Sequence, residues 1–130
     1  MIKTTNIFCS FSVKDLNTSE TFYTQILGLK TKKDWMGLHV YLADDQEVFL
    51  YAKNEDHSPA SFTVLNLVVE HIDQAVAHLL SHNISLEKYD GMPQDDDGVM
   101  RATSPEDGPS ICWFKDPSGN VISLIEATDK

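Results

Sequence analysis

The sequence has few basic residues and no long apolar run, and each absence excludes a class of protein. Its 130 residues include 10 Lys and Arg against 20 Asp and Glu, which gives a net charge of −10. Phosphate backbones are bound through basic patches, so we expect no nucleic acid partner. No segment approaches the roughly 20 apolar residues of a membrane-spanning helix, and the first residues lack the apolar region of a signal peptide. We therefore expect a cytoplasmic protein that does not enter membranes.

Cysteine is also scarce. Cys9 and Cys112 form no Cys-x-x-Cys pair, and each lies in an apolar stretch. A disulfide framework is not expected in the cytoplasm, so we expect both thiols to be buried as small apolar groups.

With 42% hydrophobic and 23% charged residues, the composition is that of one globular domain.

A strand pattern occurs twice, 56 residues apart, from Cys9 to Leu65. Around Cys9 every second position is apolar while the alternate positions are mixed, which is typical of a strand with two different faces. The same alternation returns around Leu65. We expect the apolar face of each strand to lie under a helix and the mixed face to line something else.

Each strand runs into a predicted helix. Asn17 and Asp73 are suited to cap the two helices, and Gly28 and Asn83 are suited to end them. The apolar stripe of the second helix includes Leu80, which we expect to be buried. Strand, cap and helix match at one offset, so we interpret the chain as an internal duplication.

Three more strands are predicted after each helix. We therefore expect an α+β fold with two tandem βαβββ modules, 1–54 and 62–130, joined by a linker at 55–61. The loop 91–109 is rich in Gly, Pro and Asp, and it is either a lid over a site or a mobile excursion. The predicted strands are 29–35, 38–43 and 47–52 in the first module, and 86–90, 110–115 and 121–126 in the second.

The segment after Trp113 contains a tight turn between two strands. Pro117 fixes φ for a turn, and Gly119 tolerates positive φ. The turn, Asp116-Pro117-Ser118-Gly119-Asn120, resembles the DP-x-GN signature of the vicinal-oxygen-chelate superfamily, which contains the glyoxalases, the bleomycin-resistance proteins and the extradiol dioxygenases. Further runs resemble family motifs, so the resemblance covers nearly the whole chain. They are Val13-Lys14-Asp15-Leu16, Phe22-Tyr23 and Leu27-Gly28-Leu29.

This resemblance implies an architecture and an assembly. In the family, paired βαβββ modules form a curved mixed sheet whose cleft holds the substrate. The pairing occurs within one chain or between the two chains of a dimer. The resemblance therefore implies a homodimer for this protein.

The resemblance also identifies the positions where a metal would be bound. Metal-dependent members hold a divalent ion with four side chains, usually His and Glu, one from each of four strands. The matching positions here are Phe8, Leu50, Val64 and Ser123, with Leu50 aligned to within one residue. Divalent first-row metals prefer imidazole, carboxylate or thiolate ligands, which all four positions lack. We therefore expect a site with no metal, no other cofactor and no catalytic residue carried over from the family.

Seven residues are candidates for contact with a small ligand if the mixed strand faces line the cleft. The apolar members would supply walls, with core packing as the alternative. The polar members need partners in central strands, because leaving a buried polar group unpaired costs roughly 1–3 kcal/mol. The tryptophan would stack on a planar ligand, or lie in the core or a dimer interface. The candidates are Phe8, Ser10, Leu50, Val64, Asn66, Trp113 and Ser123.

Other polar groups are weaker candidates. His39 and Tyr41 share one strand face and form a possible acid–base pair, although no carboxylate stands at a defined spacing. His78 and His82 lie four residues apart on the second helix, where a solvated flank is the better interpretation. The acidic residues of the long loop, beginning at Asp95, would attract a cation or simply remain solvated.

We interpret the chain as a metal-free protein that binds a small organic ligand, like the bleomycin-resistance branch. Its net negative charge favours a cationic ligand. The alternative is a divalent-metal-dependent glyoxalase or dioxygenase enzyme whose ligands lie off the family positions. A third hypothesis is an interaction module whose dimer surface is its function.

Overall fold

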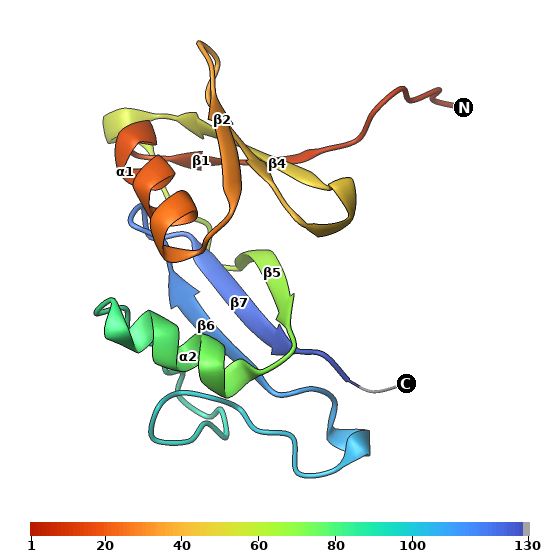
Figure 1. Cartoon of the computed structure of the whole chain (residues 1–130), viewed down its shortest axis with the longest axis vertical. Helices are drawn as coiled ribbons and strands as arrows, with labels where there is room; N and C mark the ends of the chain where they lie inside the picture. Colours follow the sequence, from red (N-terminus) through yellow and green to blue (C-terminus); the bar gives the residue numbers. More distant parts are fainter. Residues whose placement is uncertain (129–130) are drawn as a thin grey trace. The chain divides into compact units, whose positions relative to one another are not determined.

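Alternating apolar residues build two separate sheets, one in each of two units of the chain. Unit one is Met1–Pro59, and unit two begins at Ala60. The computed structural model describes residues 1–128. Each unit combines a small sheet with helices, so the expected α+β fold is confirmed (Figure 1). Within residues 1–128, no helix is long and apolar enough to cross a membrane.

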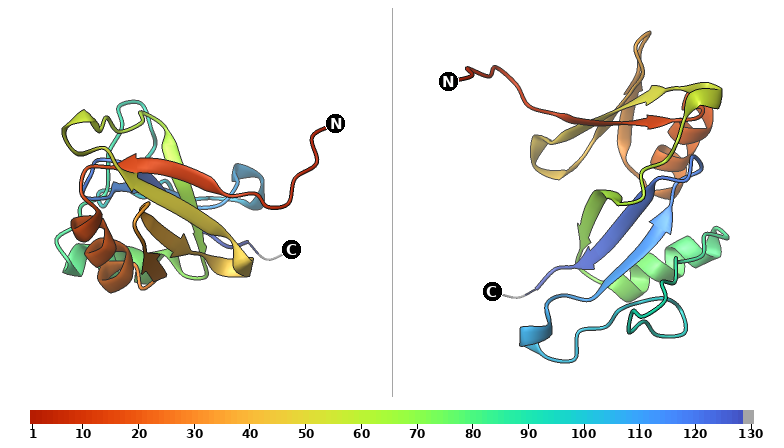
Figure 2. Two further views of the ribbon diagram at one scale, coloured as in Figure 1. Left: turned by 90° about the horizontal axis from the view of Figure 1, so that it is seen from above. Right: turned by 180° about the vertical axis from the view of Figure 1, so that it is seen from behind.

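Unit one follows the expected βαβββ order (Figure 2). β1 runs parallel to β4, and β3 is antiparallel to both β4 and β2, which gives the sheet order β1-β4-β3-β2. The elements are β1 Cys9–Val13, α1 Leu16–Thr21, the π-helical turn η1 Phe22–Ile26, β2 Lys30–Lys33, β3 Leu38–Tyr41, the 3-10 turn η2 Ala43–Asp45, β4 Glu47–Ala52 and the 3-10 turn η3 Asn54–Asp56.

One face of this sheet forms the core of unit one. Leu50 is fully buried and lies in register between Phe11 of β1 and Leu38 of β3, so all three side chains share a face. The helical segment contributes Phe22 and Tyr23, which are also buried. Burying a large aliphatic or aromatic side chain contributes roughly 1.5–3 kcal/mol. Leu50 is therefore a core residue, on the face opposite to Ser10.

The first helix begins two residues earlier than expected. Asp15 is the N-cap, and its Oδ2 accepts hydrogen bonds from the Thr18 backbone N–H at 2.8 Å and from the Thr18 hydroxyl at 2.6 Å. Asn17, the predicted cap, already lies in the helix, and its Oδ1 accepts a hydrogen bond from Lys33 Nζ at 2.6 Å. The extended backbone of Asp15 lets its carboxylate reach the free N–H groups of the first turn. The predicted stop at Gly28 is confirmed by its φ of +72°.

Unit two repeats most of this arrangement. β5 is parallel to β7, and β6 is antiparallel to β7, which gives the order β5-β7-β6. This order matches β1-β4-β3 of unit one, as an internal duplication requires. The elements are β5 Thr63–Val69, α2 Ile72–Ser81, the 3-10 turn η4 Pro105–Asp107, β6 Ile111–Lys115 and β7 Val121–Glu126.

The prediction of a strand at 86–90 was wrong. A ladder-like hydrogen bond does form there, from the Glu87 backbone N–H to the Trp113 carbonyl at 2.8 Å. The next N–H on the same side, that of Tyr89, donates instead to Gln94 Oε1 at 2.8 Å. A side chain of the following loop therefore replaces the strand ladder, and the segment leaves the sheet.

The second helix also differs from expectation at its start. His71 is the N-cap without a side-chain bond, and the Ile72 N–H donates to Glu126 Oε2 of β7 at 3.0 Å. Asp73 is therefore not a cap. The predicted stop at Asn83 is confirmed, because its φ is +62° and the next N–H, of Ile84, donates to the Leu79 carbonyl at 3.0 Å.

The stripe that α2 buries is narrower than expected. Ile72, Val76 and Leu79 are at most 5% exposed. Leu80, predicted to be buried, is 43% exposed. Successive helical residues are separated by about 100°, so the residue after Leu79 is turned away from the sheet.

The long loop is held in place by polar side chains. Asp95 Oδ1 accepts the backbone N–H groups of residues 97, 98 and 99, and its Oδ2 accepts from Arg101 Nε at 3.0 Å. Arg101 also donates to Asp73 Oδ1 of α2 at 2.6 Å. Val99 is fully buried, and Met100 makes a β-bridge with Ile111. These attachments argue against residues 94–101 opening as a lid.

The DP-x-GN segment forms the expected turn before β7. The carboxylate of Asp116 accepts from the backbone N–H groups of Ser118 and Asn120, both at 2.9 Å, and from the Asn120 side-chain amide at 3.1 Å. Gly119 has a φ of +86°, which a side chain would disfavour. The turn is therefore closed by a buried carboxylate, since Asp116 is only 4% exposed.

The two cysteines differ in environment. Cys112 of β6 is buried, as expected, and burial raises the pKa of its thiol to about 11. Cys9 is exposed, which corrects the expectation that both thiols are buried. It lies at the first position of β1, an edge strand of its sheet.

Candidate functional site

Three of the predicted site residues lie in one row across unit two. Ser123 of the central strand β7 is in register with Asn66 of β5 on one side and with Trp113 of β6 on the other. Residues in register on neighbouring strands point to the same face of a sheet. Alternation along three strands therefore brings these side chains together, as the sequence predicted.

The hydroxyl in the middle of this row is paired. Ser123 is fully buried, and its Oγ donates a hydrogen bond to Asn66 Oδ1 at 2.5 Å. This bond fixes which way the Asn66 amide points, because its oxygen is taken and its NH₂ group faces away. Asn66 itself is exposed. The row thus presents an oriented amide NH₂ group at the surface.

The other end of the row is aromatic. Trp113 is half-buried, and its ring meets that of Tyr89 edge-on, with centroids 5.6 Å apart and planes at 76°. Burial, and secondarily the charge of Glu87, raise the pKa of Tyr89, so its phenol remains neutral at physiological pH. Within residues 1–128, neither the Trp113 indole N–H nor the Asn66 NH₂ group donates to a protein acceptor.

Val64 stands beside this row without a register partner. The pairing of β5 with β7 shifts between Thr63 and Leu65, which leaves Val64 as the irregular position. Such an irregularity changes the direction of a side chain relative to the strand. Val64 is half-buried at this point.

In unit one, the predicted residues divide between the two faces of the sheet. Ser10 is in register with Phe49, and Phe49 with His39, so these three share the face that the helix does not cover. Phe8 joins them, because its ring meets that of Phe49 at 6.4 Å and 82°. Leu50 lies on the opposite, core face. Phe49 is therefore the residue of β4 that accompanies Phe8 and Ser10.

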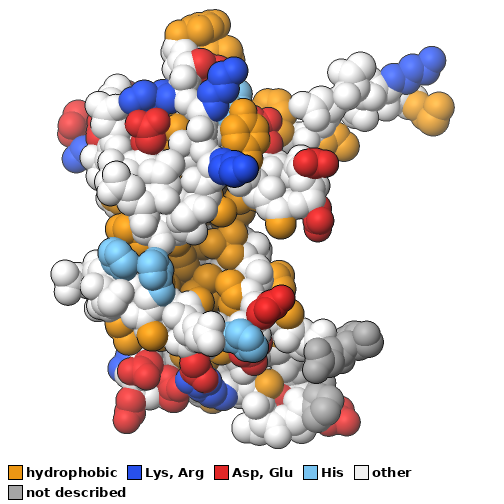
Figure 3. Space-filling model, in the orientation of Figure 1, with side chains coloured by type: hydrophobic (Ala, Val, Ile, Leu, Met, Phe, Trp, Pro, Cys, Tyr) orange, Lys and Arg blue, Asp and Glu red, His pale blue; other side chains and the backbone are white. Residues whose placement is uncertain are grey.

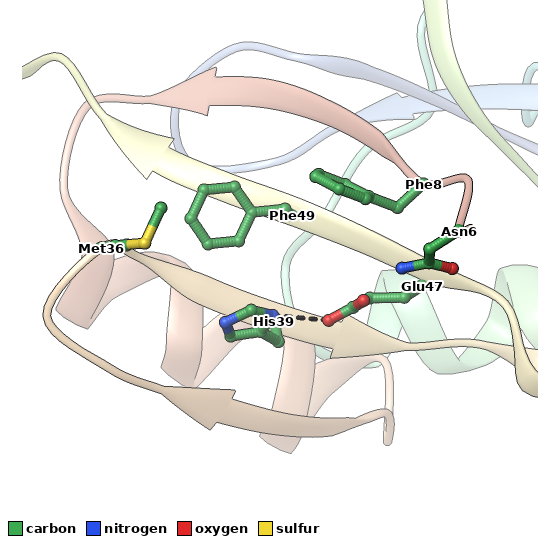
Figure 4. Close-up of a pocket in the computed structure, with 6 residues that line it drawn as sticks. All are labelled: Asn6, Phe8, Met36, His39, Glu47 and Phe49. Atoms are coloured by element: carbon green, nitrogen blue, oxygen red, sulfur yellow. Dashed lines mark hydrogen bonds and ion pairs between the residues drawn. The ribbon is translucent and has the colours of Figure 1, made fainter. Parts of the chain in front are cut away.

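A pocket of about 210 Å³ is open on this face of unit one (Figure 4). Its apolar wall consists of two phenylalanine rings and a methionine side chain, and its polar end of an asparagine, a glutamate and a histidine. The lining residues are Asn6, Phe8, Met36, His39, Glu47 and Phe49. Of these, the sequence predicted only Phe8 as a ligand contact.

His39 bonds with a carboxylate at each ring nitrogen. Its Nδ1 lies 2.5 Å from Glu47 Oε1, and its Nε2 lies 2.8 Å from Asp34 Oδ2. The hydrogen bond with Asp34, and then that with Glu47, raise the pKa of His39. The hydrogen bond with His39 is likewise the main reason that the pKa of Asp34 is lowered. Ionised carboxylates only accept hydrogen bonds, and protonation of both ring nitrogens lets His39 donate to Asp34 and to Glu47 at once, which is why its pKa is raised.

The sequence indicated His39 and Tyr41 only as a weak candidate for an acid–base pair, and the structure gives His39 different partners. His39 bonds to Asp34 and Glu47 rather than to Tyr41. Asp34 also closes the β2–β3 hairpin, because its Oδ1 accepts the N–H groups of Met36 at 2.9 Å and Gly37 at 3.1 Å. Sequence spacing gave no signal for these contacts, because they depend on how the hairpin pairs.

Gly37 leaves space for the Phe49 ring in the apolar wall of the pocket. It is buried, and a Cβ built on it would collide with the Leu50 carbonyl oxygen and would lie 2.8 Å from Phe49 Cζ. The Phe49 ring thus lies against backbone that has no side chain.

Several other aromatic, apolar and histidine side chains lie at the surface. Trp35 and Met36 are 92% and 56% exposed at the tip of the β2–β3 hairpin, where apolar atoms are visible in Figure 3. His78 of α2 and His82, the C-cap of this helix, are exposed, with ring centroids 4.5 Å apart, as expected for a solvated flank.

The residues at the family's metal positions do not fit a divalent ion. They are a phenylalanine, a leucine on the core face, a valine and a hydroxyl already bonded to an amide. None supplies the imidazole, carboxylate or thiolate that such ions prefer. Across the part of the chain that the structure describes, no three His, Cys, Asp or Glu side chains are arranged to hold a metal.

Solved structures of known proteins share this fold. FosX, the genomically encoded fosfomycin resistance protein from Listeria monocytogenes, has 11% identity and a TM-score of 0.72, with 98% of this chain and 96% of that chain covered. TnmS3, an antibiotic binding protein from a Streptomyces species, has 21% identity and a TM-score of 0.66, with coverage of 98% and 100%. Lactoylglutathione lyase from Agrobacterium tumefaciens has 16% identity and a TM-score of 0.67, with coverage of 95% of both chains.

Comparison of sequences identifies the family directly. No curated protein matches the chain in a sequence search. The family model for the Glyoxalase/Bleomycin resistance protein/Dioxygenase superfamily, however, matches residues 7–124, which is most of the chain. The repeated strand and helix order and the DP-x-GN turn agree with this match. The chain therefore belongs to the glyoxalase/bleomycin resistance protein/dioxygenase superfamily.

Proposed function

We propose that this protein binds a small organic molecule on the outward strand faces and holds it without a metal ion. The observation that carries the proposal is the row of Asn66, Ser123 and Trp113 across unit two. Phe8 and Ser10 belong to the corresponding face of unit one, and Val64 stands beside the row. Leu50 supports that face from the core side.

The row has the make-up of a recognition site for an acceptor-bearing, planar ligand. The Ser123 hydroxyl orients the Asn66 amide so that its NH₂ group points outward. The Trp113 ring offers a flat apolar surface and an indole N–H. Small-molecule sites typically combine an apolar wall with a few such directed polar groups.

We propose a site without a metal because the polar side chains in the row are poor metal ligands. Ser123 and Asn66 are neutral, and they are already bonded to each other. A divalent ion would have to break that bond and would gain only weak ligands. The ligand would therefore be held by hydrogen bonds and apolar contact alone.

The proposal also covers the cellular location and the oligomeric state of the protein. We infer that it acts in the cytoplasm as a homodimer, the first from its composition and the second from the family resemblance. TnmS3 is an antibiotic binding protein, and an antibiotic is one class of organic molecule that the site would accommodate.

Native mass spectrometry and a thermal-shift screen test the proposal together. A ligand that binds the native state must raise the melting temperature, by an amount that grows with its concentration. Trp113→Leu should abolish the shift, whereas the matched variant Trp35→Leu, at a fully exposed position, should retain it. A divalent metal bound stoichiometrically after desalting would contradict the metal-free site and favour the enzyme alternative.

A further inference from the structure

We propose that the C-terminal end of α2 binds a divalent late first-row transition-metal ion, such as Zn²⁺, Ni²⁺ or Cu²⁺, through His78 and His82. Neighbouring histidine side chains at the surface of unit two are visible in Figure 3. The site shares no residue with the row of Asn66, Ser123 and Trp113, so it is independent of the proposed function.

The helix brings the two imidazole rings to the same side of its last turn. His78 lies in α2 and His82 is its C-cap, so four residues separate them and their side chains are neighbours on the helix surface. Their ring centroids are 4.5 Å apart. Two imidazoles on one ion, with metal–nitrogen bonds of about 2.0–2.1 Å, have ring centroids roughly 4.5–5 Å apart. The two rings are therefore already spaced as a chelating pair.

A hydrogen bond to the backbone fixes the proton of the His82 ring. Its Nδ1 lies 2.9 Å from the His78 carbonyl oxygen, which can only accept, so Nδ1 donates. The Ser81 hydroxyl lies 3.2 Å from the same nitrogen, but it donates its own proton to that carbonyl at 2.7 Å. Neutral His82 then has its lone pair on Nε2. An Nδ1–H group bonded to a backbone carbonyl is a usual support of a metal-ligating histidine.

Both rings can reach a common ion. The two side chains are exposed, and exposed side chains change rotamer within picoseconds to nanoseconds. Across residues 1–128, no protein group bonds to the Nε2 atom of His82. His78 takes part in further interactions, and the ion would have to compete with these.

The surroundings favour a cation, and the ligand type selects its class. α2 has 10 residues, and the partial negative charge of its C-terminal carbonyl groups lies at this last turn. The chain as a whole carries a net charge of −10. Imidazole suits Zn²⁺, Ni²⁺ and Cu²⁺, whereas Mg²⁺ and Ca²⁺ prefer oxygen ligands. The site should therefore discriminate between these two classes of ion.

Isothermal titration calorimetry of the tag-free protein with ZnCl₂, and separately with MgCl₂, tests the proposal. We expect one Zn²⁺ per chain at this site with a Kd on the order of 10–100 µM, weaker than in four-ligand structural sites because only two side chains bind. Mg²⁺ should give no binding isotherm. Equal binding of the two ions, or Zn²⁺ saturation only at concentrations on the order of 1 mM, would overturn the proposal.

Three variants locate the ion. His78→Ala and His82→Ala should each weaken Zn²⁺ binding at least about tenfold, because each leaves a single imidazole. His71→Ala is the matched control, since His71 is the exposed N-cap at the other end of α2 and its side chain makes no capping hydrogen bond. It should change the affinity less than about twofold. If all three variants bind Zn²⁺ alike, the pair is not the site.

NMR of the unaltered protein decides should a variant fail to fold. Paramagnetic Cu²⁺, added in small amounts to the ¹⁵N-labelled protein, should broaden the amide signals of residues 78–84 before those of other segments. Broadening that begins elsewhere and spares this segment would refute the site.

The variant with both His78→Ala and His82→Ala separates this ion from a metal in the row of unit two. An ion held by two side chains should be lost on desalting, so native mass spectrometry of desalted protein reports only a tighter site. A metal that survives desalting in the double variant would contradict the proposed function and not the site on α2. Zn²⁺ binding that the double variant leaves unchanged would contradict the site on α2 and leave the proposed function intact.

Discussion

Ser123 and Asn66 are joined by a 2.5 Å hydrogen bond between two parallel strands, with the hydroxyl fully buried and the amide exposed. This asymmetry gives the two residues different energetic roles. Removing the Asn66 side chain leaves the buried Ser123 hydroxyl without its acceptor. Removing the Ser123 hydroxyl leaves the Asn66 amide oxygen, which water can reach.

We predict that Asn66→Ala is more destabilising than Ser123→Ala. A buried hydroxyl without a partner lowers the free energy of unfolding by roughly 1–3 kcal/mol, whereas removal of the hydroxyl together with its hydrogen bond lowers it by about 1 kcal/mol. In urea denaturation, the double variant should lose less stability than the sum of the two single variants, with a coupling of about 1 kcal/mol. Strictly additive losses would show that the bond contributes nothing.

The stability of unit one should depend on pH through the His39 cluster. The pKa of His39 is raised from 6.5, so its stabilising contribution is complete below about pH 6.5 and is lost as pH rises through the higher folded value. The pKa of Asp34 is lowered from 3.8, so its contribution is present above about pH 3.8 and is lost as pH falls through the lower folded value. The cluster should therefore stabilise the fold most between these two values.

The free energy of unfolding, measured from pH 4 to 9 for the wild type and for His39→Gln, checks this dependence. The difference between the two proteins should shrink as pH rises above 6.5. A difference that stays constant or grows would mean that His39 is not held as the imidazolium. Titration of the His39 ring by NMR gives the folded pKa directly.

The thiols should react at very different rates. Cys9 is exposed, while Cys112 is fully buried with its pKa raised to about 11. Only the thiolate reacts with a disulfide reagent, so one thiol per chain should react rapidly in the native protein. Cys9→Ser should remove the rapid phase and Cys112→Ser should leave it unchanged. Two rapid thiols in the native state would contradict the burial of Cys112.

Arg101 should control the mobility of the long loop more than the stability of the fold. Its two ion pairs, with Asp73 and Asp95, are partly exposed, so together they are worth less than about 1 kcal/mol. Arg101→Met should accelerate hydrogen exchange at residues 95–99 while changing the melting temperature little. Lys88→Met, at an exposed lysine outside any described ion pair, is the control and should leave that exchange unchanged.

Much of the fold could be predicted because strand alternation is a local property. The bounds of β4 and β7 were predicted to the residue, and the mixed faces correctly placed Asn66 and Ser123 together, whereas Trp113 was a candidate because of its aromatic ring. The α+β class and the family followed from the repeat and the DP-x-GN turn.

What failed depended on one-residue shifts or on pairing between distant segments. The family position in β4 was assigned to Leu50, which lies in the core, whereas its neighbour Phe49 lies on the open face. An alignment shift of one residue changes the face because side chains alternate along a strand. The hydrogen bonds of His39 with Asp34 and Glu47 exist only once β3 pairs with β4 and the hairpin closes. A pattern within a single segment carries no information about such contacts.

The buried glycine at position 37 limits how this protein can change in evolution. The Cβ of any larger residue there would collide with the Leu50 carbonyl oxygen of β4, and it would also press on the Phe49 ring. A smaller residue in place of Phe49 would not remove the clash with the backbone, so the glycine is required for as long as this segment packs against β4. Among diverging descendants, a glycine retained between Met36 and Leu38 would mark the lineages that kept this close packing, even where overall identity has faded.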